Sequence, residues 1–87
     1  MIDMNNLTKN DRLKILILKQ YKKHLIDYTS SYLSNMLNHK FETVKKALDF
    51  FYEIGVMEKE IKDHGNKTIT YYSLTDLGLR LINSNKI

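Results

Sequence analysis

Two short amphipathic stretches, separated by a tight polar break, lie between Thr29 and Gly55 of this 87-residue chain. In the first stretch Leu33, Met36 and Leu37 recur at helical spacing, which predicts a short helix with one buried stripe. The second stretch repeats this pattern over a longer run, so it predicts a second helix with one hidden and one exposed face. Two such helices joined by a tight break are typical of a helix-turn-helix.

The second helix divides on a helical wheel into an apolar face and a charged face. At about 100° per residue the apolar side chains share one side: Val44, Ala47, Leu48, Phe51 and Ile54. The opposite side carries Glu42, Lys45, Lys46, Asp49 and Glu53. A helix in the DNA major groove presents its N-terminal and basic residues to bases or phosphates, which Lys45 and Lys46 suit. The wheel also allows a solvated face with i,i+4 ion pairs: Glu42 with Lys46, and Lys45 with Asp49.

The segment from Leu33 to Val44 reads LSNMLNHKFETV. It resembles the helix-turn-helix of MarR-like and PadR-like winged-helix transcription regulators, whose pattern is roughly LAxxLxLSxSTV. Val56 and Met57 follow Gly55 as the family's apolar pair follows a helix-ending glycine, and the segment Tyr72 to Gly78 is similar to its closing YxLTxxG. The resemblance covers about residues 10 to 83 and implies a winged helix-turn-helix that binds DNA.

The chain departs from this family pattern at two neighbouring positions of the turn. His39 stands where the family usually has an apolar residue, so the turn is expected to be less dry. Lys40 stands where the family usually has serine, which removes the usual cap of the recognition helix.

The whole chain predicts an α+β fold in the order helix, short strand, helix, helix, two-stranded wing, helix. Thr8, Thr29 and Thr75 are the expected helix caps, and Gly55 is the expected helix stop. The expected elements are helices over 9–23, 30–37, 41–54 and 76–83, an extended link over 25–28, and strands over 56–62 and 68–74 with a turn over 63–67. Residues 1–8 are expected to form an N-terminal arm, 9–83 the domain and 84–87 a C-terminal tail.

The helices expected over 9–23 and 76–83 carry more apolar residues than a single buried stripe would hold. This excess predicts a dimer contact in addition to a core. The core positions expected from the pattern are Leu13, Leu16, Ile17, Tyr21, Tyr72, Leu74, Leu77 and Leu81. The residues expected beside that core, at the interface of a two-fold homodimer, are Ile15, Leu18, Leu79 and Ile82. In the returning strand Ile69 and Tyr71 are expected to face away from the core, beside Ile61.

The DNA-contacting residues are expected on the helix-turn-helix and the wing. The recognition helix enters the major groove, with Lys45 and Lys46 on base edges or phosphates and Phe41 or Thr43 near thymine methyls. Ser31 and Lys40 are expected on the phosphate backbone. Lys62, His64 and Lys67 at the wing tip are expected on the phosphate backbone or in the minor groove, the alternative being a polar turn that contacts only water. The hydrogen-bonding residues expected to face outward on the first helix of the motif are Ser30, Ser31, Tyr32 and Asn35.

Composition narrows the function classes. The net charge of +4 and pI near 9.3 favour an anionic partner only mildly. There is no cysteine, so disulfides and thiolate metal sites are excluded and a cytoplasmic setting is expected. The three histidines stand on different predicted elements without metal-site spacing, and the sequence shows no phosphate-binding glycine motif, catalytic constellation, signal peptide or membrane span. We therefore expect no metal, cofactor, membrane contact or enzymatic activity.

The sequence thus predicts a homodimeric transcription regulator that binds double-stranded DNA sequence-specifically. The residue bias, rich in Asn, Ile, Lys and Tyr and free of proline, is typical of an AT-rich genome such as an archaeal, viral or plasmid one. Two alternatives stay open: a protein interaction adaptor, and an architectural or segregation protein that coats DNA without sequence preference.

Overall fold

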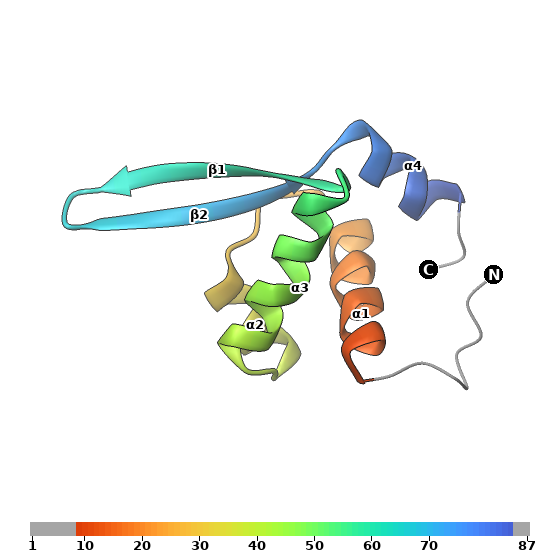
Figure 1. Cartoon of the computed structure of the whole chain (residues 1–87), viewed down its shortest axis with the longest axis horizontal. Helices are drawn as coiled ribbons and strands as arrows, with labels where there is room; N and C mark the ends of the chain where they lie inside the picture. The colour runs from red at the N-terminus through yellow and green to blue at the C-terminus, as the bar shows by residue number, and fades with distance from the viewer. Residues whose placement is uncertain (1–8, 85–87) are drawn as a thin grey trace.

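Four helices and one antiparallel hairpin make up the fold, as the computed structural model of residues 9–84 shows (Figure 1). The elements are α1 (Lys9–Lys23), α2 (Ser30–Leu37), α3 (Phe41–Glu53), β1 (Met57–His64), β2 (Lys67–Leu74) and α4 (Asp76–Ser84). Their order confirms the predicted α+β winged helix-turn-helix. The predicted arm over 1–8, with its Thr8 cap, and residues 85–87 of the predicted tail lie outside the described residues.

Local hydrogen bonds explain where the helix-turn-helix begins and turns. The Thr29 side chain accepts a 3.1 Å bond from the backbone N–H of Tyr32, which confirms the predicted cap of α2. Asn38 ends α2 in the left-handed conformation at φ 56°, which asparagine tolerates better than most residues. Lys40 precedes α3 without a side-chain cap, as its replacement of serine predicts.

The wing begins at a glycine turn and projects beyond the helices (Figure 1). Gly55 lies two residues after the end of α3 and has φ +82°. It stops the helix as predicted, because glycine adopts this conformation without steric cost. The strands pair from Met57 opposite Leu74 to His64 opposite Lys67, so the turn holds two residues instead of the predicted five. Gly65 takes φ +74° in that turn, as a tight hairpin turn requires.

The extended link before α2 contributes a single bridge to the hairpin. Tyr28 pairs with Tyr72 through backbone bonds of 3.0 and 2.8 Å. The predicted strand over 25–28 is therefore reduced to one residue. Leu25 and Ile26, which precede it, are exposed.

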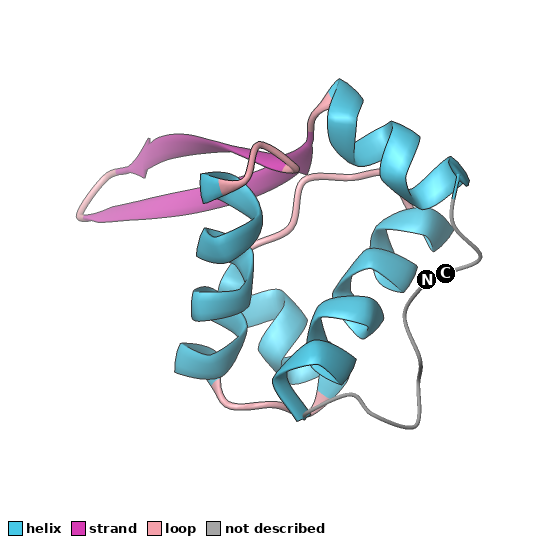
Figure 2. Cartoon of the chain, turned by 45° about the vertical axis from the view of Figure 1, so that its right-hand side comes forward, coloured by secondary structure: helices cyan, strands magenta, loops and turns pink. Residues whose placement is uncertain are grey.

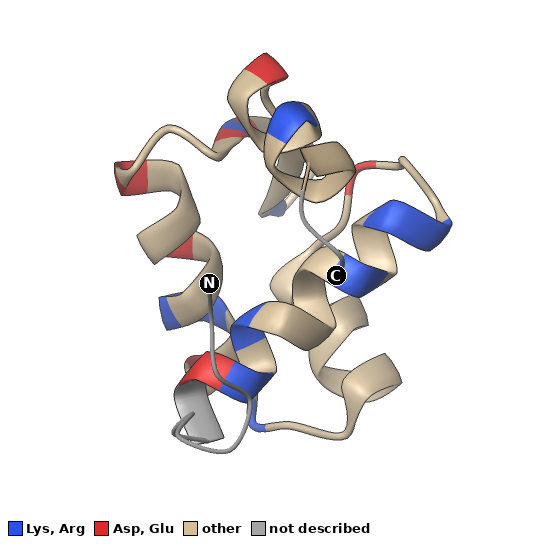
Figure 3. Ribbon diagram, turned by 90° about the vertical axis from the view of Figure 1, so that its right-hand side faces the viewer, with Lys and Arg blue, Asp and Glu red and all other residues tan. Residues whose placement is uncertain are grey.

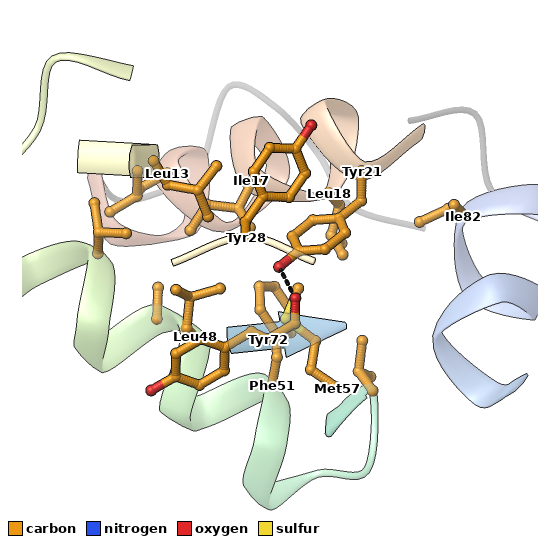
Figure 4. Close-up of a cluster of buried hydrophobic side chains, with 14 residues drawn as sticks. Leu13, Ile17, Leu18, Tyr21, Tyr28, Leu48, Phe51, Met57, Tyr72 and Ile82 are labelled. Atoms are coloured by element: carbon orange, nitrogen blue, oxygen red, sulfur yellow. Dashed lines mark hydrogen bonds between the residues drawn. The ribbon is translucent and has the colours of Figure 1, made fainter. Parts of the chain in front are cut away.

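The core lies where α1, α3, the base of the hairpin and α4 meet (Figure 4). Its most deeply buried side chains include Leu13, Ile17, Tyr21, Tyr28, Leu33, Leu48, Met57, Tyr72 and Ile82. The hydroxyl of Tyr21 donates a 2.7 Å bond to the backbone oxygen of Tyr72, drawn as a dashed line in Figure 4. Burial raises the pKa of the Tyr21 hydroxyl well above its usual range, and the neighbouring Tyr28 and Asp27 add to the effect.

Helix α4 packs with a different face from the one predicted. Gly78 and Ile82 are buried, whereas Leu77 is 51% exposed and Leu81 only half-buried. A side-chain carbon at Gly78 would overlap the backbone oxygen of Val56 and lie 2.9 Å from Leu74. The missing side chain lets α4 approach the hairpin, which turns Ile82 into the core and Leu77 outward.

Several other burial predictions on the helices are wrong. Leu18 is buried in the core instead of beside it, and Ser30 is buried although it was expected to face outward. The side chains predicted as buried but found about two-fifths or more exposed are Leu16, Met36 and Ile54. Ile54 follows the last residue of α3, so it no longer lies on the helical stripe.

The two faces of the wing also correct one expectation. Directly paired residues share a face of a hairpin, and Ile61 pairs with Thr70. Ile61 therefore lies on the Tyr72 face, opposite to Ile69 and Tyr71, where it is 68% exposed. Tyr72 is buried and Leu74 partly buried against the core, as predicted.

Candidate nucleic-acid interface

Helix α3 lies beside α1, and the base of the wing meets α3 near its C-terminal end (Figure 2). The outer face of α3 therefore has an edge toward α1 and an edge toward the wing. Its inner face is buried through Val44, Ala47, Leu48 and Phe51, so all four of these predictions are confirmed. Phe41 at the N-terminal end of α3 is 47% exposed, and Lys45 and Lys46 are exposed. The helix thus offers its N-terminal half to a partner.

The wing-side edge of this face is organised around the Asp49 carboxylate. One oxygen accepts 2.8 Å hydrogen bonds from the Tyr72 hydroxyl and from Lys59 Nζ, and the other lies 3.2 Å from Lys45 Nζ. The Lys59 ammonium also lies over the ring of Tyr52, 4.4 Å from its centroid. Two lysines that could face DNA are therefore paired with one carboxylate, which offsets part of their charge.

This network shifts the titration of both acidic partners. Partial burial acts to raise the pKa of Asp49, but the hydrogen bonds from Lys59, Tyr72 and Lys45 outweigh burial and hold it below its ordinary 3.8. Burial raises the pKa of the Tyr72 hydroxyl far above its ordinary value, and the bond to Asp49 raises it further. Asp49 is therefore charged, and Tyr72 neutral, throughout the neutral pH range.

The α1-side edge contains a groove of about 280 Å³. Its lining residues are Leu13, Lys14, Glu42, Thr43, Lys46, Ala47 and Phe50. Lys14 Nζ lies 4.1 Å from the ring centroid of Phe50, and Phe50 is 41% exposed. In contrast to the wing-side edge, none of the ion pairs formed within residues 9–84 involves Lys14 or Lys46. The predicted alternative pair of Glu42 with Lys46 is thus not formed, whereas that of Lys45 with Asp49 is.

Both signs of charge lie along α3, whereas α2 carries no charged residue (Figure 3). The acidic residues of α3 are Glu42, Asp49 and Glu53, and its basic residues are Lys45 and Lys46. The outer face of this helix is therefore not a uniformly basic surface.

The predicted basic residues of the wing tip share one face of the hairpin. His64 pairs directly with Lys67, and Lys62 lies two residues before His64 on β1. Tyr71 joins them, with its hydroxyl 3.4 Å from His64 Nε2 and its ring 4.9 Å below Lys62 Nζ. Lys62, His64 and Lys67 are all exposed, so the structure brings these three predicted residues together.

The remaining predicted contacts lie on or beside the helix-turn-helix. Ser31 and Lys40 are exposed, and Thr43 is half-buried at the edge of the α1-side groove. Sequence reasoning did not find Lys14 or Lys59, because both reach α3 from other elements and no local spacing connects them to it.

The predicted dimer residues divide into two groups. Leu18 and Ile82 are 5% and 2% exposed within a single chain, so they are not available to a second copy in this conformation. Ile15 and Leu79 are half-buried. Those two remain candidates for a dimer contact.

The sequence matches no protein-family model and no curated protein. Solved structures do match. The chain is similar to smu.1704 from Streptococcus mutans, with a TM-score of 0.68 and 24% identity over 83% of this chain and 70% of that one. It is also similar to a possible transcriptional regulator from Methanosarcina mazei, with a TM-score of 0.71 and 17% identity over 91% of this chain and 66% of that one.

A third similar structure is Stf76 from the Sulfolobus islandicus plasmid-virus pSSVx, with a TM-score of 0.63 and 20% identity over 88% of this chain and 96% of that one. ZitR from Lactococcus lactis is covered over only 57% of its length, so this chain is much shorter than that protein. At these identities the likeness establishes the winged-helix fold alone.

Within residues 9–84 no three His, Cys, Asp or Glu side chains come together in a way that could hold a metal ion. None of the helices formed by these residues is both long and apolar enough to cross a membrane.

Proposed function

We propose that this chain is a transcription regulator that binds double-stranded DNA with α3 in the major groove. The observation that carries the proposal is the exposed N-terminal half of α3 in a winged-helix fold whose projecting wing carries Lys62, His64 and Lys67 on one face of its tip. The similar structure from Methanosarcina mazei, a possible transcriptional regulator, supports the same function. Phe41 or Thr43 would lie near thymine methyls, and Lys45 and Lys46 would contact base edges or phosphates. Lys40, Ser31 and the wing tip would contact phosphates.

The protein would act as a homodimer through α1 and α4, with Ile15 and Leu79 at the contact. A two-fold dimer of helix-turn-helix domains reads half-sites about one helical turn, roughly 34 Å, apart. A footprint covering one isolated half-site would contradict this arrangement.

A second function, that of a protein interaction adaptor, is favoured by the mixed charge of α3. Three acidic residues share that helix with two lysines, and Tyr52 and Ile54 at its C-terminal end are nearly half exposed. Such a surface suits a protein partner as well as an anionic one.

The deciding experiment is a titration of labelled duplex DNA at several salt concentrations. The probes are the sequence upstream of the protein's own gene and a scrambled duplex of equal length. Strong preference for the upstream sequence, with affinity that falls steeply as salt rises, supports a specific regulator. Equal, salt-sensitive affinity for both indicates an architectural role, and no binding at low salt favours the adaptor.

A further inference from the structure

The two edges of the recognition helix differ in how their lysines are paired. On the wing side, Lys45 and Lys59 both lie within 3.2 Å of Asp49. On the α1 side, Lys14 and Lys46 line one groove and take part in none of the ion pairs formed within the described chain. An incoming anion must compete with Asp49 for Lys45 and Lys59. It can bind Lys14 and Lys46 without breaking an ion pair.

The α1-side groove has the chemistry of a phosphate site. Its lining residues include two lysines, Lys14 and Lys46, and the hydroxyl-bearing Thr43, against one acidic residue, Glu42. The Phe50 ring lies beneath Lys14 Nζ at 4.1 Å, and such a cation–π contact restrains a side chain that would otherwise sample many rotamers. Lys14 is therefore held over the groove before a ligand arrives.

The position of the groove matches the path of a DNA strand. A helix with its side chains is about 10 to 12 Å wide, and the major groove is about 12 Å wide. A helix that enters the groove fills it, so each edge of the helix lies beside one phosphate backbone. The α1-side groove runs along α3 from Glu42 to Phe50, a stretch that begins in the N-terminal half expected to enter.

We infer that the groove between α1 and α3 seats a backbone phosphate of the bound DNA between Lys14 and Lys46. The inference rests on the proposed function and adds a contact from α1, outside the helix-turn-helix and the wing. Lys14 is thus a DNA-binding residue, and Glu42 lowers the affinity of the site by repelling the phosphate.

The test is the salt dependence of binding to a mixed-sequence duplex, because a phosphate contact does not depend on base sequence. Each phosphate contact contributes about 0.9 to the slope of log affinity against log salt. Lys14→Ala should lower the magnitude of that slope by about 0.9, and Lys14→Arg should restore it. Glu42→Gln should raise the affinity at low salt.

Lys19→Ala is the matched control, because Lys19 is an exposed lysine on another face of the same helix. It should leave the slope at the wild-type value. Circular dichroism and thermal unfolding of each variant establish that the fold is retained. A Lys14→Ala slope equal to that of wild type, in a wild-type protein that binds DNA, would overturn the groove assignment and leave the proposed function standing.

A titration with inorganic phosphate separates a DNA site from a site for a free anion. One outcome would assign the groove to a free anion and overturn the inference. In that outcome inorganic phosphate shifts the Thr43 and Phe50 amide resonances in a saturable way, and Lys14→Ala leaves the DNA salt slope unchanged. A wild-type protein without salt-dependent DNA binding would overturn both this inference and the proposed function.

Discussion

The hydroxyl of Tyr72 on β2 donates a 2.8 Å hydrogen bond to the carboxylate of Asp49 on α3. The backbone of the same tyrosine accepts from the Tyr21 hydroxyl at 2.7 Å and pairs with Tyr28. Tyr72 therefore connects the wing to α1, to the link before α2 and to the recognition helix. Lys59 on β1 bonds to the same carboxylate at 2.8 Å, so Tyr72 and Lys59 together hold the wing against α3.

Removal of the bond between Asp49 and Tyr72 should destabilise the fold. A hydrogen bond to a charged group contributes about 1.5 to 3 kcal/mol, and the Asp49 side chain keeps 28% of its exposure, so we expect the lower end. A double-mutant cycle of Asp49→Ala and Tyr72→Phe, measured by urea unfolding, should give a coupling of about 1.5 kcal/mol. Glu53→Ala, an exposed acidic residue of α3, should show no coupling to Tyr72→Phe.

The stability contributed by Asp49 should disappear in acid. The pKa of Asp49 in the folded protein lies below its ordinary 3.8, so folding favours the charged carboxylate. Its contribution is fully present above pH 3.8 and is lost as the pH falls through the lowered value. The difference in unfolding free energy between wild type and Asp49→Asn should therefore shrink as the pH falls below 3.8. A difference that stays constant from pH 7 to pH 2 would contradict this assignment.

The packing of α4 through Gly78 makes that position sensitive to one methyl group. Gly78→Ala should destabilise the fold by about 2 kcal/mol, because the new carbon overlaps the rigid backbone at Val56. Leu77→Ala, one position away and 51% exposed, should change the unfolding free energy by less than about 0.5 kcal/mol. Thermal or urea unfolding of both variants measures this contrast, and a larger loss for Leu77→Ala would restore the face predicted from the sequence.

Hydrophobic periodicity predicts the elements of this fold but not the phase of every helix. The caps Thr29 and Thr75 and the stop Gly55 form the predicted local hydrogen bonds or φ angle, because neighbouring residues decide them. Gly78 has no side chain for a hydrophobicity pattern to count, so the pattern gives the α4 core face to Leu77. The close contact with Val56 that reverses this is a tertiary property.

The candidate site shows the same division. The exposure of Lys45 and Lys46 follows from the period of α3 itself. The contacts that lysines of other elements make with α3 do not follow from that period. Lys59 reaches Asp49 from the wing, and Lys14 reaches Phe50 from α1. A sequence pattern within α3 contains no information on either contact.

A charge at Ile15 should prevent self-association without unfolding the chain. Ile15 is half-buried on α1, and an aspartate at a two-fold contact places two buried carboxylates near each other. Ile15→Asp should sediment as a monomer at concentrations where the wild type is a dimer, with an unchanged circular dichroism spectrum. Lys19→Asp, on the exposed side of α1, should remain dimeric. A wild-type protein that is monomeric throughout would remove the proposed dimer.

Lys45 and Lys46 provide a matched pair for the role of α3 in DNA binding. Both are exposed lysines one position apart, so each alanine substitution removes one charge from the same helix. Lys45 lies 3.2 Å from Asp49 and must give up that ion pair to reach DNA, whereas Lys46 has no such partner within residues 9–84. We expect Lys46→Ala to weaken binding about tenfold and Lys45→Ala about threefold or less, and the double variant to lose about 2 kcal/mol. Titrations of one duplex at fixed salt measure the affinities of all three variants. An unchanged affinity of the double variant would exclude α3 as the recognition helix, because the lysines nearest its entering end would then lie away from the DNA.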